Sequence, residues 1–115
     1  MAKILIIDDS RLSTSALSNM LSELGHQVLD TAYSGEDGLK KAKELNPEVV
    51  CLDFVMPGID GRETAVKLKQ QNSSTKIVMI TQNEVAQEAK SEINAVAYIV
   101  KPITRSKLET ALNQV

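Results

Sequence analysis

Four short apolar runs in this chain are almost uninterrupted by polar residues. Strands that face water on one side alternate apolar and polar residues, whereas strands covered by helices on both faces of a parallel sheet are apolar throughout. The four runs therefore predict buried parallel strands. A fifth run, with more alternation, predicts another strand at His26–Ala32. The four apolar runs are Lys3–Asp8, Glu48–Asp53, Lys76–Thr81 and Val96–Val100.

The segments between these strands carry apolar residues at helical spacing. In the first, Ser10 is of a type that caps helices and Gly25 is typical of a helix stop. Its expected inward face holds Leu12, Ala16, Leu17, Met20, Leu21 and Leu24. Helices are also predicted from Ser34 to Asn46-Pro47, over Gly61–Gln71, over Glu84–Ile93 with a sparse apolar face (Val85, Ala86, Ala89 and Ile93), and over Thr104–Val115.

Five strands alternating with five helices predict an α/β fold, an open, doubly wound, five-stranded parallel sheet with helices on both faces. The chain has 115 residues, and we expect them to form one domain, residues 1–115. In such a sheet a ligand binds at the carboxyl ends of the strands, near the switch in strand order. The pattern of residues does not itself give that order.

The overall charge and the apolar runs limit the classes of function. A formal net charge of −2 predicts neither direct nucleic-acid binding nor attraction to an anionic membrane. No apolar run approaches the ~20 residues that a membrane-spanning helix needs. The single cysteine, Cys51, has no partner for an internal disulfide, which is compatible with a reducing compartment. We therefore expect a cytoplasmic protein.

Charged and hydroxyl side chains stand at four of the predicted strand ends. Asp8 and Asp9 end the first strand, Asp53 the third, Thr81 the fourth and Lys101 follows the fifth. Parallel strands bring these ends to one edge of the sheet, where three carboxylates repel one another. A divalent cation and the lysine would compensate that repulsion, and ligands that are all oxygens favour magnesium or manganese.

Each of these residues also has an ordinary interpretation when it is taken alone. An aspartate at a strand end is usually a turn residue or a helix cap, Thr81 is of a type that caps helices, and Lys101 is of a type common on surfaces. It is the combination of acid pair, acid, hydroxyl and lysine at successive strand ends that points to a shared site.

Four sequence segments carry a resemblance that covers the whole chain. They read I-I-D-D, L-D-F-V-M-P-G-I-D-G, V-M-I-T and Y-I-V-K-P, in this order. In this combination the chain resembles the response-regulator receiver domains (CheY-like) of two-component signalling systems. The resemblance implies the strand order 2-1-3-4-5 of the flavodoxin-like and CheY-like (βα)5 fold. It also implies a phosphoacceptor signalling domain rather than an enzyme.

The family's site roles transfer to matching positions of this chain. Asp53 matches the aspartate that is phosphorylated in the family. Asp9 matches the acidic residue that binds Mg²⁺ directly, and Asp8 matches its neighbour, which assists Mg²⁺ binding, often through a water molecule. Asp53 and the backbone carbonyl of Val55 would complete the protein ligands, and Mn²⁺ would also suit them. Lys101 matches the lysine that pairs with the phosphoryl oxygens.

The resemblance also implies a switch and a set of partners. Thr81 matches the hydroxyl that moves to the phosphoryl group, Tyr98 the aromatic whose rotamer follows it, and Pro102 a proline that often follows a cis bond. The expected phosphodonor is a histidine kinase or a histidine phosphotransfer protein. The expected output is a downstream protein or effector domain, or a phosphorylation-linked dimer, bound at the face made by the last two helices and the fifth strand.

Two residues depart from the family's usual pattern, and three other functions remain as alternatives. Gln82 replaces a small residue after the switch hydroxyl, and Asn94 replaces a glycine before the fifth strand, although asparagine tolerates a left-handed turn.

One alternative function is a receiver-like interaction module that needs no phosphorylation. Another is a flavodoxin-like cofactor binder, but two carboxylates open the loop where such a protein cradles phosphate. A third is a phosphatase with an aspartyl intermediate, which would need a general acid where Val55 stands.

Overall fold

The five predicted strands form a single parallel sheet. The computed structural model describes residues 1–85 and 87–115. The strand order is β2-β1-β3-β4-β5, and every neighbouring pair is parallel. This confirms the predicted fold class and strand order. The strands are β1 (Lys3–Ile7), β2 (Gln27–Ala32), β3 (Val49–Asp53), β4 (Lys76–Thr81) and β5 (Ala97–Val100).

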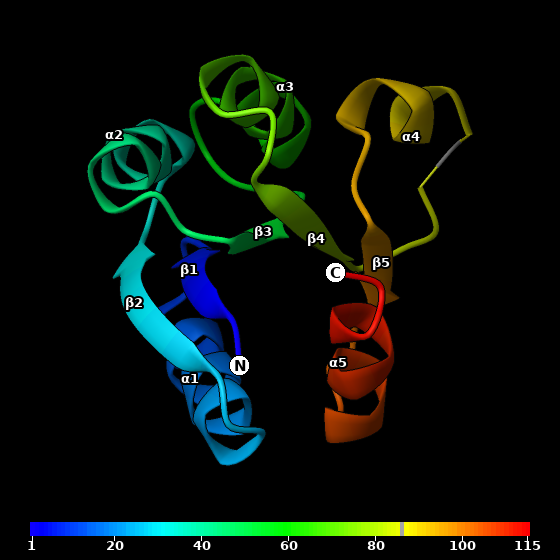
Figure 1. Cartoon of the computed structure of the whole chain (residues 1–115). Helices are drawn as coiled ribbons and strands as arrows, with labels where there is room; N and C mark the ends of the chain where they lie inside the picture. The colour runs from blue at the N-terminus through cyan, green and yellow to red at the C-terminus, as the bar shows by residue number, and fades with distance from the viewer. Residues whose placement is uncertain (86) are drawn as a thin grey trace.

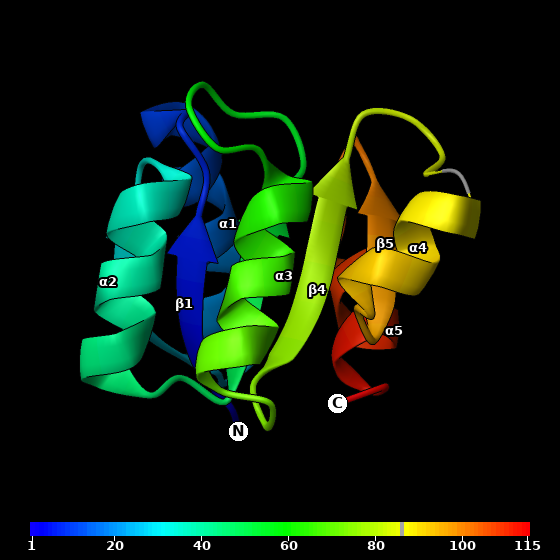
Figure 2. The same ribbon diagram turned by 90° about the horizontal axis from the view of Figure 1, so that it is seen from above.

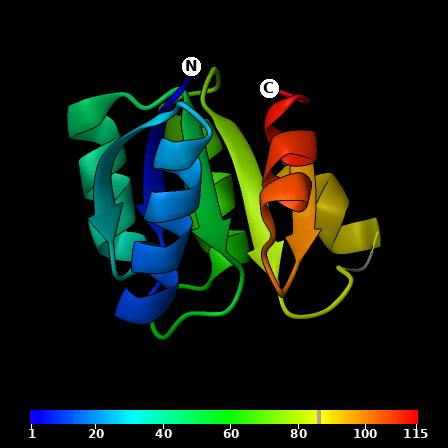
Figure 3. The same cartoon turned by 90° about the horizontal axis from the view of Figure 1, so that it is seen from below.

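Helices cover both faces of this sheet. Figure 1 shows α2, α3 and α4 in one layer and α1 and α5 in the other, with the sheet between them. Figure 2 looks onto the first layer and Figure 3 onto the second. The helices are α1 (Arg11–Glu23), α2 (Gly35–Leu45), α3 (Gly61–Gln71), α4 (Gln87–Ile93) and α5 (Arg105–Leu112). In the described part of the chain, none is long and apolar enough to cross a membrane.

The strands β1, β3 and β4 bury side chains on both faces, which explains their unbroken apolar sequences. One core cluster joins strand residues such as Leu52 and Met79 to the helix layer of α2, α3 and α4. The other joins residues such as Ile6 and Cys51 to α1 and α5. Cys51 in β3 is fully buried. The sheet is therefore the centre of two apolar layers, and its edge strands β2 and β5 are less buried than the strands between them.

Local sequence signals fix several helix ends as predicted. The hydroxyl of Ser10 accepts a hydrogen bond from the Ser13 N–H and caps α1, and Ser34 caps α2 in the same way. Gly25 follows α1 with a φ of 89°, in the left-handed region that favours glycine. Asn46 ends α2 with a φ of 50°. These caps set the lengths of the helices and so the positions of the strands that follow.

Three predicted details are wrong. Leu12 was expected on the inward face of α1, but its side chain is 83% exposed, and Ala16 is exposed as well. The α4 helix begins at Gln87 rather than Glu84, and the α5 helix ends at Leu112 rather than Val115. Ala86, which was expected on the inward face of the fourth helix, lies outside the described residues.

Candidate functional site

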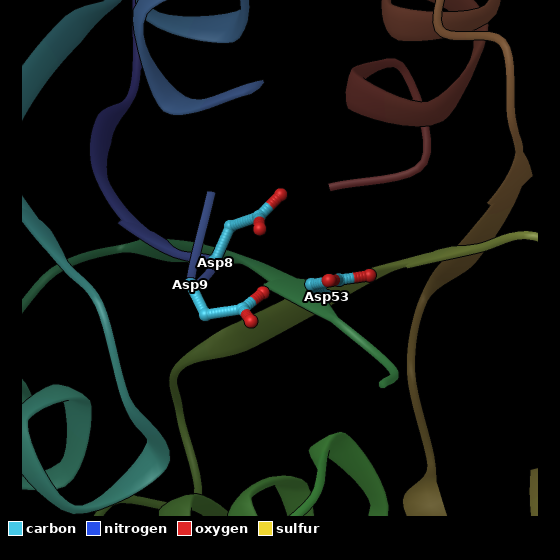
Figure 4. Close-up of side chains that lie close together, drawn as sticks. All are labelled: Asp8, Asp9 and Asp53. Carbon is cyan, nitrogen blue, oxygen red and sulfur yellow. The ribbon is translucent and has the colours of Figure 1, made fainter. Parts of the chain in front are cut away.

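Three carboxylates meet at the carboxyl ends of β1 and β3. Ile7 of β1 and Leu52 of β3 are partners in the strand register, so Asp8 and Asp53, which follow them, end neighbouring strands at the same level. Asp9 joins them from the next position of the chain, as Figure 4 shows. One oxygen from each carboxylate lies within 4.8 Å of the others. Asp8 and Asp53 are buried, whereas Asp9 is exposed.

Burial and mutual repulsion oppose ionisation of this cluster. Burial, and then the charge of Asp8, raise the pKa of Asp53 to about 6, although Lys101 acts in the opposite direction. The pKa of Asp8 is also raised, chiefly by burial, while a hydrogen bond from the Ser10 backbone lowers it. The site thus holds more negative charge than its surroundings stabilise. Such a set of oxygen ligands fits a hard divalent cation like Mg²⁺.

Asp8 is held in place by the start of α1. The backbone N–H of Ser10 donates a 2.9 Å hydrogen bond to Oδ1 of Asp8, and the N–H of Asp8 donates to the carbonyl of Ala32 at 3.0 Å. Because Ser10 also caps α1, the helix cap and the carboxylate are fixed by one short turn. The orientation of Asp8 therefore depends on secondary structure on both sides of it.

Lys101 reaches the same cluster from the end of β5. Thr81 of β4 is the register partner of Val100, so the residue after Val100 lies at the level of the strand ends. The Nζ atom of Lys101 lies 3.5 Å from Oδ1 of Asp53, an ion pair that is long for a hydrogen bond. The peptide bond between Lys101 and Pro102 is cis, as the resemblance implies.

The side chains of Thr81 and Tyr98 make contacts of their own near the site. Thr81 is buried at the end of β4, and its hydroxyl donates a hydrogen bond to the backbone carbonyl of Asn83. Tyr98 is partly buried, and its hydroxyl oxygen has no hydrogen-bond partner among the described residues. Burial raises the pKa of that hydroxyl. The Nζ atom of Lys90 lies 5.0 Å from the centre of the Tyr98 ring.

Val55 and Gln82 lie at the rim of the site. Val55 is 66% exposed and Gln82 is also exposed. Beside the strand ends lies a cavity of about 340 Å³ between the loop after β3 and the segment after β4. Its lining residues are Phe54, Val55, Thr81, Gln82, Asn83, Glu84, Val85 and Ala89. The structure therefore gathers every predicted site residue at the carboxyl edge of the sheet except Tyr98, which packs beneath α4.

Two contributions to the site were missed in the sequence. One is the carbonyl of Asn83 that binds the Thr81 hydroxyl, because a backbone acceptor leaves no trace in residue types. The other is Gly61, whose N–H donates to the carbonyl of Phe54 at 2.8 Å. A glycine at the first position of a helix, where glycine has poor helix propensity, was the available signal.

Comparison with known proteins gives one family. The model of the response regulator receiver domain matches residues 4–113. The response regulator GacA of Pseudomonas aeruginosa is 35% identical over 118 residues, which cover 100% of this chain and 55% of GacA. The chemotaxis protein CheY of Treponema pallidum is 32% identical over 111 residues, which cover 92% of this chain and 76% of CheY.

A solved structure gives the same result. The response regulator protein TrrA of Thermotoga maritima, crystallised in complex with Mg²⁺ and BeF, has a TM-score of 0.88 and is 31% identical, with 99% of this chain and 98% of TrrA covered. The chain spans about half of the length of GacA from P. aeruginosa and 38% of the length of GacA from Pseudomonas syringae. The match to these longer proteins therefore concerns one part of each.

Proposed function

The chain belongs to the response regulator receiver domain family, and from this premise we propose that residues 1–115 form one receiver domain that accepts a phosphoryl group at Asp53. The observation that carries the proposal is the meeting of Asp8, Asp9 and Asp53, with Lys101 beside them. The Ser10 hydrogen bond and the Lys101 ion pair offset only part of the cost of burying two carboxylates that face a third. A role in binding a cation and a phosphoryl group explains why they are kept together.

The cluster would hold one Mg²⁺ ion through Asp8, Asp9 and Asp53, with the Val55 carbonyl added by the family resemblance. Mn²⁺ prefers similar oxygen donors. When bound, the cation would neutralise charge on the phosphoryl oxygens. The TrrA complex with Mg²⁺ and BeF supports this part of the proposal.

The reacting group is a carboxylate oxygen of Asp53. It attacks the phosphorus of a phosphohistidine, an O–P bond forms, the P–N bond breaks, and the imidazole leaves with the electron pair and takes a proton. Attack needs the ionised carboxylate, which the raised pKa makes scarce below about pH 6 in the absence of a cation. Lys101 stabilises the charge on the phosphoryl oxygens. The proposed role is that of a phosphoacceptor signalling domain, which assists its own phosphorylation and dephosphorylation, rather than that of an enzyme.

The phosphorylated state would act through Thr81. Phosphoryl oxygens are stronger acceptors than the Asn83 carbonyl that now binds the Thr81 hydroxyl, so the hydroxyl would change partners. Tyr98, whose hydroxyl has no partner in the described structure, would follow. The resulting change at α4, β5 and α5 would alter binding of an output protein, an attached effector domain or a second copy. The phosphodonor would be a histidine kinase or a histidine phosphotransfer protein, and the predicted cytoplasmic location stays a prediction.

Labelling with a small phosphodonor tests this function. Wild-type protein incubated with acetyl phosphate and Mg²⁺ should gain one phosphoryl group by intact-mass spectrometry, and Asp53→Asn should gain none. Asp60→Asn is the matched control, because it changes an exposed aspartate of the same loop and keeps a capping side chain. Label that survives in Asp53→Asn, or forms equally in chelator, contradicts the assignment. Absence of any label would favour the interaction module that works without phosphorylation.

A further inference from the structure

The first residue of α3 lies directly against the backbone of the phosphoacceptor strand. A Cβ atom placed on Gly61 would lie 2.5 Å from the carbonyl oxygen of Asp53 and 2.5 Å from Cα of Phe54. Both are backbone atoms, which cannot rotate away as the end of a flexible side chain can. Any side chain at position 61 would therefore move either the start of α3 or the end of β3.

Backbone hydrogen bonds fasten the same place from two directions. The N–H of Gly61 donates to the carbonyl of Phe54 at 2.8 Å, and the N–H of Phe54 donates to the carbonyl of Ile80 in β4 at 2.9 Å. Phe54 thus has both of its backbone groups bound. The loop from Phe54 to Asp60, which contains Val55, is closed at its base by Gly61.

The start of α3 has little freedom to yield. Oδ1 of Asp60 accepts a 2.9 Å hydrogen bond from the Glu63 N–H, and the Asp60 carbonyl accepts from the Thr64 hydroxyl at 2.7 Å. Thr64 and Leu68 are buried in the same helix. A shift of α3 away from β3 would break this packing, so a side chain at position 61 would instead displace Asp53 and the loop.

We propose that Gly61 is a positioning residue for the phosphoacceptor reaction: its missing side chain lets α3 fix the backbone of Asp53 and the loop carrying the Val55 carbonyl, so that both are presented together to the cation. This inference rests on the proposed function. It adds a residue that touches neither the cation nor the phosphoryl group but sets where their ligands stand.

The Mg²⁺ affinity of two α3 variants, measured without any phosphodonor, tests the proposal. Titration followed by backbone amide shifts should show Gly61→Ala binding Mg²⁺ at least about tenfold more weakly, the size of effect seen when groups that orient metal ligands are lost. Leu68→Val is the matched control. It removes buried volume from the same helix, 1% exposed in the wild type, away from the loop. It should lower the melting temperature while its Mg²⁺ affinity stays as in the wild type.

The outcomes separate this proposal from the function on which it rests. If wild type takes up phosphoryl and Gly61→Ala binds Mg²⁺ as tightly as wild type, the positioning role is wrong and the function stands. If wild type neither binds Mg²⁺ nor becomes labelled, the function itself fails. An equal loss of affinity in Leu68→Val would show a general effect of lower stability and would also overturn the positioning role.

If Gly61→Ala does not fold, the wild-type protein carries the test. Mg²⁺ should slow hydrogen exchange of the Gly61 amide, because the cation would hold the loop that its hydrogen bond closes. The Gly38 amide, which donates to the Ser34 carbonyl at the start of α2, is the internal reference, and its exchange should not change. Gly61 exchange that is unaffected by saturating Mg²⁺ would overturn the proposal.

Discussion

Helices α3 and α4 lie in the same layer of the molecule, yet they are held in very different ways (Figure 2). Helix α3 has 11 residues, begins at the Asp60 cap and buries Gly61, Thr64, Ala65 and Leu68. Helix α4 has 7 residues, and Ile93 is the one that is buried among those described. A helix with so few buried residues opens at a lower free-energy cost.

Apart from Ile93 and the partly buried Ala89, which pack against the core, the described contacts of α4 are polar and near the surface. Arg62 of α3 binds Glu92 with Nε 2.8 Å from Oε2 and Nη2 2.5 Å from Oε1, and both side chains are about half exposed. Lys90 lies over the ring of Tyr98. The difference indicates that α3, which follows the Asp53 loop, is anchored to the sheet more firmly than α4. We expect phosphorylation to change α4 and to leave α3 unchanged.

The largest expected effect comes from shortening the buried side chains of the two helices. Leu68→Ala in α3 should lower the free energy of unfolding by roughly 3 kcal/mol, the usual cost of a cavity in a packed core. Ile93→Ala should lower it less, because α4 would open locally before the domain unfolds. Urea denaturation gives the global values, and amide exchange shows the local opening. Equal losses of unfolding free energy in the two variants, with the α4 amides still protected from exchange, would show that α4 is anchored as firmly as α3.

A smaller effect on the free energy of unfolding is expected from the titration of the Asp53 carboxyl group in the presence of a chelator. Its pKa is about 6 in the fold and about 4 in an unfolded chain, so the folded state binds the proton more tightly. The stabilising proton is therefore present at pH 4 and lost between about pH 4 and pH 6, which should lower stability by roughly 2–3 kcal/mol.

The Asp53→Asn variant isolates this titration from the other carboxyl groups. Its melting temperature should equal that of the wild type near pH 4 and exceed it at pH 7 in chelator. Mg²⁺ should narrow this difference in melting temperature by stabilising the wild type. Thermal melts across pH provide the measurement. A wild type that is more stable than Asp53→Asn at pH 7 in chelator would show that the carboxylates are not strained.

The smallest effect is expected from the exposed ion pair that joins the two helices. Arg62→Met and Glu92→Gln should each speed amide exchange in α4 a few-fold and leave α3 unchanged, because exposed pairs contribute little to global stability. In a double-mutant cycle, the α4 amides of the double variant should exchange no faster than those of either single variant. Strictly additive effects would show that the two residues act separately and do not tie α4 to α3.

Sequence reasoning predicted the sheet and the acid cluster well for physical reasons. Strands buried on both faces leave apolar runs, and carboxylates at strand ends converge by topology alone. Helix α1 shows where the pattern is ambiguous. Leu12, Ala16 and Met20 form one helical stripe and Leu17, Leu21 and Leu24 another. Of the two stripes, only the second contributes fully buried residues to α1. Thr14 is also buried, but it is polar and so does not appear in a hydrophobic pattern.

The parts of the site that were not predicted depend on backbone geometry. The carbonyl of Asn83 and the close approach of Gly61 to Asp53 involve main-chain atoms that every residue possesses. The start of α4 was placed three residues early because Val85 continues the helical spacing of Ala89 and Ile93. Tertiary contacts, which single-sequence patterns do not contain, decide such positions.

The burial of Cys51 has a practical consequence for spectroscopy. The chain has one cysteine, it is fully buried in β3, and burial raises the pKa of its thiol to about 12. Thiol reagents attack the thiolate, so the native protein behaves toward maleimides and nitroxide labels as if it had no cysteine. A single Ser91→Cys substitution on the exposed side of α4 would then carry a spin label or fluorophore without background, and Cys51 could stay in the core.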